Sequence, residues 1–256
     1  MNRRNFLKSG LSVGTVLLFN PSPTHVFSWV SDRTAYAPGE RIAEDAFVLD
    51  KELKKHTLLE LCGRTGAPVN MLYIYGGGAH RNRHRLGGIW CRDSFEDFYV
   101  LRYLHQKYDN SAVQIIPVAV PPVYASEFYG FERRVFLDEP ADSEQFKESA
   151  VAFIESTEQA VVNEFIPVTT YYDIRNRLLF NQRNDLRPGE GYGKIYSWQG
   201  KFRSDQETQK YGTPTVWMLS PEGVVLEPPF WGNIYHGNPH VRYTIPDIEQ
   251  AIQKHF

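Results

Sequence analysis

The strongest constraint on the fold of this chain is a pair of apolar runs separated by a helix-like segment. Residues 68–75 read PVNMLYIY and residues 113–120 read VQIIPVAV, so both runs are apolar at nearly every position. Runs of this length indicate strands that are buried on both faces of a sheet. Between them we expect a helix from about Ser94 to Tyr108, because one helical face repeats Phe95, Phe98, Leu101 and Leu104. This order predicts parallel strands joined by a right-handed crossover.

The rest of the chain continues the alternation of strands and helices. We expect further strands at residues 46–50, 165–172 and 215–219, a second helix that opens at Asp142 or Ser143, and a closing helix at 246–255. Pro221-Glu222-Gly223 predicts a hairpin turn, and the polar stretch 181–210 reads as an insertion. The pattern predicts one α/β domain with helices on both faces of its sheet and with long inserted loops.

The charge balance and the hydropathy pattern limit the partners. The chain has 28 basic and 30 acidic residues among 256, for a formal net charge of -2. Without residues 1–30, which hold Arg3, Arg4 and Lys8 and no acid, the balance is -5. A mildly acidic body gives no reason to expect nucleic-acid binding. No internal stretch reaches the ~20 apolar residues of a membrane span, so we expect no stable span.

The first residues look like a targeting segment. Asn2-Arg3-Arg4-Asn5-Phe6-Leu7-Lys8 precedes a short apolar run from Gly10 to Phe19, which resembles a twin-arginine export signal. The resemblance implies a signal at 1–30, a linker at 31–43 and a domain at 44–256, with the mature protein periplasmic or extracellular. Cleavage near Val26-Phe27-Ser28 and cleavage near Ala35-Tyr36-Ala37 both remain open. The alternative is a basic tail on a cytosolic protein.

Only two cysteines are present, Cys62 and Cys91, so at most one disulfide can form. Cys91 follows the first apolar strand and its glycine-rich end, and it stands at the start of the expected helix. A helix amino terminus carries unpaired N–H groups and about half a positive charge, which lowers the pKa of a thiol. We therefore expect a lowered pKa at Cys91, with Arg92, Ser94 and the helix end stabilising the thiolate. The alternative is a buried structural cysteine.

Two motifs resemble the thioredoxin-like superfamily, in its redoxin branch, over about residues 44–256. Trp90-Cys91-Arg92-Asp93-Ser94 stands where that family has Trp-Cys-x-x-Cys, and Tyr211-Gly212-Thr213-Pro214-Thr215 stands where it has Gly-x-Pro-Thr before a strand. The resemblance implies a three-layer sandwich with a central mixed sheet. It also implies a cis-proline at Pro214 that packs against Cys91, and a substrate groove shaped by Trp90, Thr213 and Pro214.

The chain departs from this family at Ser94, which replaces the second cysteine. A Cys-x-x-Ser pair cannot close its own disulfide. Cys62 precedes the strand at 68–75 and Cys91 follows it, and about seven strand residues span ~23 Å, whereas a disulfide needs Cα atoms within about 7 Å. We interpret Cys62 as a packing residue. Any redox chemistry at Cys91 then needs an external thiol or the disulfide of a partner protein.

Two other resemblances are weaker. Peroxiredoxins place Pro-x-x-x-Thr/Ser-x-x before their reactive cysteine, but His84 and Gly88 stand at the two key positions here. The tail Gly237-Asn238-Pro239-His240-Val241-Arg242-Tyr243 resembles the end of bacterial deiodinase-like proteins, although the residues that flank Cys91 do not match an enzyme of that activity.

The histidines leave a metal as a minor alternative. His80 and His84, like His236 and His240, are spaced four apart, which on a helix places two imidazoles on one face. Nearby glycines and Pro239 favour loops instead, so we expect no metal and no other cofactor. Two functions remain open. One is an oxidoreductase that uses the Cys91 thiol for thiol-disulfide exchange or peroxide reduction. The other is a non-catalytic binding module that has lost its dithiol and holds a partner peptide beside Pro214 or a metal through histidines.

Overall fold

The computed structural model of the chain describes the following residues: 35–79, 88–108, 111–122, 140–164, 168–179, 198, 200–202, 212–231 and 243–256. The twin-arginine motif with Arg3 and Arg4 lies outside them, as do both histidine pairs (His80 with His84, His236 with His240). Tyr211, most of the insertion expected at 181–210 and most of the tail at 237–243 also lie outside the described residues.

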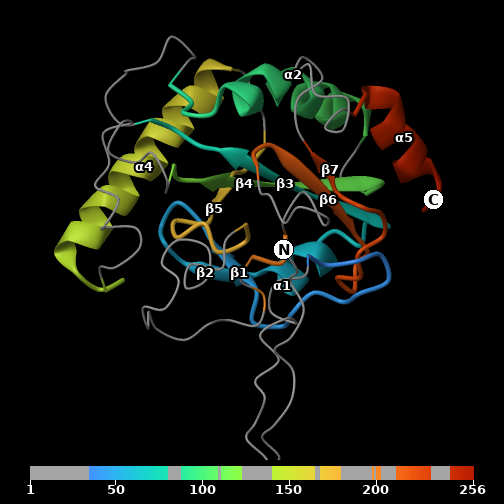
Figure 1. Cartoon of the computed structure of the whole chain (residues 1–256), viewed down its shortest axis with the longest axis horizontal. Coiled ribbons are helices and arrows are strands. Elements are labelled where there is room, and N and C mark those ends of the chain that lie inside the picture. The colour runs from blue at the N-terminus through green and yellow to red at the C-terminus, as the bar shows by residue number, and fades with distance from the viewer. Residues whose placement is uncertain are drawn as a thin grey trace, which may run out of the picture.

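The central element is a sheet whose strands follow the order β2-β1-β5-β4-β3-β6-β7 in the described part of the chain (Figure 1). Its strands are β1 (Phe47–Leu49), β2 (Lys55–Thr57), β3 (Val69–Gly76), β4 (Val113–Val120), β5 (Tyr171–Tyr172), β6 (Thr215–Leu219) and β7 (Phe230–Trp231). β3 pairs with β4 in parallel and with β6 in antiparallel, so the sheet is mixed, as predicted.

The helices connect the parallel strands and cover the sheet. They are α1 (Leu58–Gly63), α2 (Arg92–Lys107), α4 (Glu144–Asn163) and α5 (Ile245–Gln253). α2 joins β3 to β4 and α4 leads from β4 to β5, and both strand pairs are parallel, as predicted. Figure 1 shows α2 above the sheet, α4 descending along its left side and α1 below it, so helices lie on both faces. α1 and β2 are too short to leave a periodic signal in the sequence, and neither was predicted.

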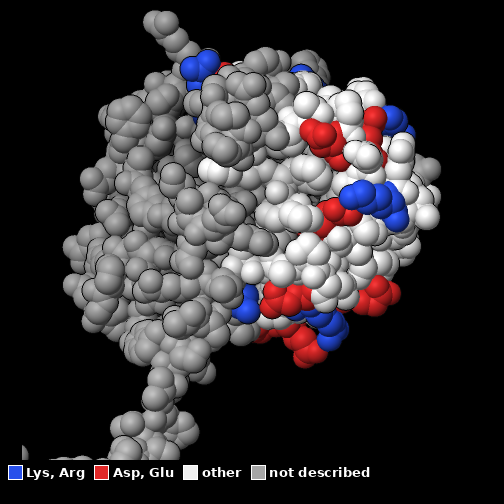
Figure 2. Space-filling model, turned by 45° about the vertical axis from the view of Figure 1, so that its right-hand side comes forward, with Lys and Arg blue, Asp and Glu red and all other residues white. Residues whose placement is uncertain are grey.

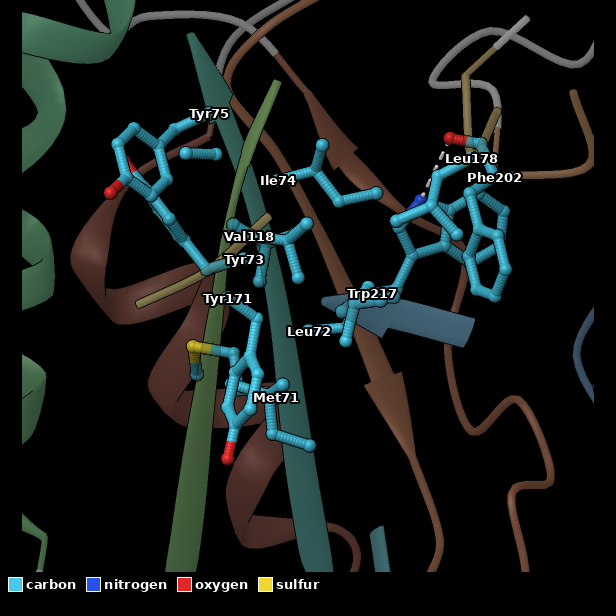
Figure 3. Close-up of a cluster of buried hydrophobic side chains, with 14 of the residues drawn as sticks. Met71, Leu72, Tyr73, Ile74, Tyr75, Val118, Tyr171, Leu178, Phe202 and Trp217 are labelled. Atoms are coloured by element: carbon cyan, nitrogen blue, oxygen red, sulfur yellow. Dashed lines mark hydrogen bonds between the residues drawn. The ribbon is translucent and has the colours of Figure 1, made fainter. Parts of the chain in front are cut away.

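The core is built on β3, which is buried at every position. Successive strand residues point to opposite faces. Figure 3 shows Tyr73 and Tyr75 on one side of the strand and Ile74 on the other, near Trp217. The Trp217 indole N–H donates a hydrogen bond to the carbonyl of Phe202, which joins β6 to the buried segment that contains Phe202.

The segment before β1 also packs on the domain. Tyr36 and Ile42, which lie in the stretch expected as a linker, are both buried. The Tyr36 hydroxyl accepts a hydrogen bond from the Ala43 amide, and Arg41 bridges to Val224 in antiparallel. The packed part of the chain therefore begins before residue 44.

Two expected boundaries differ from the structure. Of the strand expected at 165–172, the described residues form only β5, because Val168 to Thr170 have no strand pairing and 165–167 lie outside the described set. α2 begins at Arg92 rather than Ser94, with Cys91 as its N-cap. Ser94 and Asp97 have the spacing of a capping box, but they do not form one, because both side chains are buried beneath the helix and serve other contacts.

The described surface carries mixed charge. Figure 2 shows acidic and basic side chains interspersed over the described part of one face, without a single-sign patch there. No helix in the described part of the chain is long and apolar enough to cross a membrane.

Candidate functional site

Cys91 lies where β3 has ended and α2 begins, opposite the segment that leads into β6. Its backbone is extended (φ -97°, ψ 114°), as an N-cap requires. The Sγ atom donates to the carbonyl oxygen of Thr213 at 3.2 Å, and the Thr213 hydroxyl donates to Sγ at 3.1 Å. The Thr213–Pro214 peptide bond is cis. The structure therefore brings together Cys91, Thr213 and Pro214, as the family resemblance implied.

The pKa of Cys91 departs from the expectation. Burial raises the pKa of the Cys91 thiol above its ordinary value, and this effect outweighs the hydrogen bonds from Ser94 and Thr213 that lower it; the nearby charge of Asp93 raises it further. The expectation of a lowered pKa is wrong in direction. Cys91 does lie at the helix terminus, but burial destabilises the thiolate more than the terminal N–H groups stabilise it.

The glycines at the end of β3 allow this close packing. A Cβ atom at Gly76 would lie 2.3 Å from the Cβ of Cys91. A Cβ at Gly78 would lie 2.4 Å from the backbone of Ser156 in α4. The Gly78 amide also donates to the Thr157 hydroxyl at 2.8 Å. The glycine-rich end of β3 thus lets both the cysteine and α4 approach the main chain.

Ser94 is a positioning residue rather than a surface cap. It is fully buried, and its Oγ accepts a hydrogen bond of 2.9 Å from the Gly76 amide. It also hydrogen-bonds Cys91 in a way that lowers the pKa of that thiol. The hydroxyl therefore links the last residue of β3 to the first turn of α2, directly beneath the sulphur.

The other two residues that flank the cysteine have separate partners. The Trp90 indole N–H donates to the carbonyl of Val120 at 2.8 Å, which fixes the indole across the ends of β3 and β4. Arg92 is exposed and pairs with Glu96 at 2.6 Å along α2. No contact from Arg92 to Cys91 appears among the described residues, so its expected role in stabilising a thiolate stays a prediction.

Trp231 closes the other side of the cis-proline segment. A Cβ at Gly212 would lie 2.1 Å from the indole nitrogen of Trp231, so this indole rests on the Gly212 backbone. β7 places it there, because Trp231 pairs with Thr215 in β6. Sequence reasoning gave Trp231 no role, since an isolated tryptophan in a short strand carries no periodic signal.

A buried carboxyl, Asp97, lies about one turn after Ser94 in α2 and was not predicted as part of the site. Asp97 accepts hydrogen bonds from the hydroxyls of Tyr73, at 2.8 Å, and of Tyr243. Burial raises the pKa of Asp97 to about 7, against the lowering effect of the two hydroxyls. The available signal was its spacing, because Asp97 falls on the same helical face as Phe98 and Leu101.

Cys62 is separate from this site. It lies in α1, is fully buried, and burial raises the pKa of its thiol to about 12. Both cysteines are free thiols. The interpretation of Cys62 as a packing residue agrees with this environment. Among the described residues, no group of three or more His, Cys, Asp or Glu side chains is gathered as metal ligands.

These features define a thioredoxin-like α/β fold. β3, α2 and β4 form a parallel β-α-β unit, β6 and β7 continue the sheet in antiparallel, and α5 closes the chain. The cis-proline that precedes β6 faces the cysteine that opens α2. The predicted fold class is confirmed, including the mixed sheet with helices on both faces.

Several solved structures are similar to this chain at low sequence identity. A hypothetical protein from Sinorhizobium meliloti 1021 is 12% identical with a TM-score of 0.43, over 86% of this chain and 85% of that one. The thioredoxin domain of a thiol-disulfide oxidoreductase from Bacteroides vulgatus is 10% identical with a TM-score of 0.38, over 85% and 99%. A thioredoxin-like protein from Bacteroides caccae is 14% identical with a TM-score of 0.34, over 84% and 49%.

No family model matches the chain, and no curated protein matches it in sequence. The fold assignment therefore rests on the strand order and on the cis-proline opposite Cys91.

Proposed function

We propose that this chain is an exported thioredoxin-like redox protein that works through one thiol, Cys91, with an external thiol as its resolving partner. The observation that carries the proposal is the seating of the Cys91 sulphur between the amino terminus of α2 and the cis Thr213–Pro214 peptide, with the buried hydroxyl of Ser94 where a second cysteine would close a disulfide.

The simplest chemistry is thiol–disulfide exchange. The Cys91 thiolate attacks one sulphur of a substrate disulfide, the S–S bond breaks, and the other sulphur leaves as a thiolate that takes a proton. An external thiolate then attacks the mixed disulfide at the substrate sulphur and releases Cys91 as a thiolate. Because the chain has only two cysteines and Cys62 is buried in α1, the second nucleophile comes from another molecule.

Peroxide reduction uses the same sulphur. The thiolate attacks a peroxide oxygen, the O–O bond breaks, and the products are a sulfenic acid on Cys91 and an alcohol or water. One external thiol condenses with the sulfenic acid, forming a mixed disulfide and releasing water. A second external thiol then reduces that disulfide, so two thiols are oxidised for each peroxide.

The surrounding groups have distinct roles in both reactions. The Thr213 hydroxyl and Ser94 donate to the developing thiolate, while the Thr213 carbonyl holds the resting thiol as a hydrogen-bond acceptor. Trp90 and Pro214 form the walls of the substrate groove. Because the pKa of Cys91 is raised, we expect the rate to rise with pH through the neutral range and beyond.

The test uses the two cysteines as matched variants. Wild type and Cys62→Ser should form one mixed disulfide per chain with an aromatic disulfide reagent, detected by intact mass, and should turn over with glutathione. Cys91→Ser should do neither. Native alkylation should modify Cys91 alone, and Cys62 should react only in denaturant. If Cys91→Ser retains turnover, the proposed site is wrong.

Export is tested separately. Residues 1–34 fused to a folded reporter should carry it out of the cytoplasm by the twin-arginine route. Replacing both Arg3 and Arg4 with lysine should retain the reporter inside the cell, whereas replacing Lys8 with glutamine should not. Export that survives the double replacement would argue for a different route.

The raised pKa of Cys91 favours one second candidate. A thioredoxin-fold binding module that has lost its dithiol would hold a peptide beside Pro214 and would not need a reactive thiolate. Such a module would bind its peptide equally well with Cys91 or with serine at position 91, and it would show no turnover of disulfide or peroxide at any pH. The kinetic comparison above separates the two candidates.

A further inference from the structure

The strongest feature outside the thiol chemistry is the buried carboxyl of Asp97, which joins three elements. Tyr73 reaches it from β3, and Tyr243 reaches it from the residue pair that leads into α5. Both hydroxyls donate to the same oxygen, Oδ2. The other oxygen, Oδ1, is buried and has no hydrogen-bond partner among the described residues. The carboxyl is therefore only half satisfied.

Tyr243 also contacts the opposite half of the site. Its ring packs edge-on against Phe230 with centroids 6.0 Å apart. Phe230 belongs to β7, pairs with Val216 in β6, and accepts a hydrogen bond from the Thr215 hydroxyl through its carbonyl. Tyr243 therefore contacts both Asp97 in α2, the helix that Cys91 caps, and Phe230 in β7, which follows the cis-proline in the chain.

Apart from the two phenol donors, the groups around Asp97 do not stabilise a negative charge. Asp93 on α2 adds a like charge, and Tyr73 and Tyr243 are themselves held neutral, because burial raises the pKa of each. The charge of an ionised Tyr99 would raise the pKa of Tyr243, and that of an ionised Cys91 would raise the pKa of Tyr73. None of these groups is a cation, so an ionised Asp97 has two phenol donors and no counter-charge among the described residues.

We infer that the Asp97 carboxyl is a pH-sensitive latch: its neutral form holds Tyr243 and α5 on the domain, and its ionisation releases them. Loss of the proton to solvent leaves a charge that the docked state solvates poorly. Undocking of Tyr243 lets water reach both carboxylate oxygens. Docking is then strongest at acidic pH and weakens as the carboxyl ionises.

The direction follows from linkage. The pKa of Asp97 is about 7 when docked, against 3.8 for an ordinary aspartate. Between these two pKa values Asp97 is ionised in the undocked state but still protonated in the docked state. The equilibrium constant for docking therefore falls by up to about tenfold per pH unit, and it becomes constant above the docked pKa. Other contacts resist this release. They are the buried apolar face of α5 (Ile248, Ala251 and Ile252) and the ion pairs of Lys107 with Glu249 and of Lys254 and His255 with Glu227. His255 pairs with Glu227 at 3.0 Å, so it needs its own control.

The test is amide hydrogen exchange of α5 in the full chain at pH 5 and pH 8, corrected for the intrinsic exchange rate. In wild type, protection of α5 should fall at least about tenfold between the two pH values, while amides of β3 keep theirs. In Asp97→Asn, protection of α5 should be the same at both. In His255→Gln, the wild-type pH dependence should remain.

A second variant covers the case in which Asp97→Asn does not fold. Tyr243→Phe keeps the ring against Phe230 but removes a donor that favours the ionised form, so the midpoint of release should move to higher pH. The latch is overturned if wild-type α5 is equally protected at both pH values, if Asp97→Asn keeps the pH dependence, or if His255→Gln removes it. None of these readouts depends on redox activity.

Discussion

At the scale of single residues, the site is a balance between burial and hydrogen bonding at one sulphur. Cys91 has the helix terminus expected of a reactive thiol, yet burial raises its pKa. The two groups that offset this effect are Ser94 and Thr213. Their hydroxyls therefore set how much thiolate is present at a given pH.

Thr213→Val should slow the chemistry of Cys91 without changing the backbone. Valine keeps the branched shape but removes the donor that lies 3.1 Å from Sγ. A hydrogen bond to a charged group is worth ~1.5–3 kcal/mol, so the pKa of Cys91 should rise and alkylation near pH 8 should slow by about tenfold or more. The check is the rate of iodoacetamide modification against pH. An unchanged pH profile would show that the hydroxyl does not stabilise the thiolate.

At the scale of elements, the junction of β3 and α2 decides whether the chain can act as a dithiol. Ser94 occupies the third position of α2, buried beneath Cys91 and bonded to Gly76. The geometry that closes a disulfide in a Cys-x-x-Cys helix start is thus already present, and one oxygen stands in place of one sulphur.

Ser94→Cys should restore an intramolecular disulfide with Cys91. Oxidation should consume two thiols per chain, and the variant should turn over disulfide substrates without an accumulating mixed disulfide. The measurement is thiol counting under native conditions, with mapping of the cross-linked peptide. Ser94→Ala is the matched control: it cannot cross-link, and it leaves the Gly76 amide without its acceptor at a cost of about 1–3 kcal/mol in unfolding free energy. A Ser94→Cys protein that stays fully reduced under oxidant would contradict the inferred geometry.

The elements themselves were largely predictable where the signal was local. The apolar runs at β3, β4 and β6 and the stripe of α4 define their strands and helix to within a few residues. The junction of β3 and α2 was not predictable in detail, since Ser94 and Asp97 fit a surface capping box equally well. Only the packing of the helix on β3 turns both side chains inward. The pKa of Cys91 was misjudged for the same reason, because a sequence shows the helix terminus but not the burial of the sulphur.

At the scale of the whole molecule, stability should depend on pH through Asp97. Its pKa is about 7 in the folded protein and near 3.8 when unfolded. A raised carboxyl pKa contributes stability that is full below the unfolded value and is lost as pH rises to the folded value.

Asp97→Asn should remove this part of the pH dependence. Relative to the variant, wild type should lose on the order of 2–3 kcal/mol of unfolding free energy between pH 5 and pH 8. Urea denaturation of both proteins at the two pH values measures the difference. Parallel behaviour of wild type and variant across this range would show that Asp97 does not titrate in the folded protein.

The close approach of β3 to the site has an optical consequence. A Cβ atom placed on Gly76 would lie 2.3 Å from the Cβ of Cys91 and 2.9 Å from the indole ring of Trp90. The indole and the cysteine are therefore both close to the same backbone position. Thiolates and disulfides quench indole emission at short range. We therefore expect Trp90 emission to differ between wild type and Cys91→Ser, and to report the oxidation state of Cys91 in the proposed reaction without an attached dye.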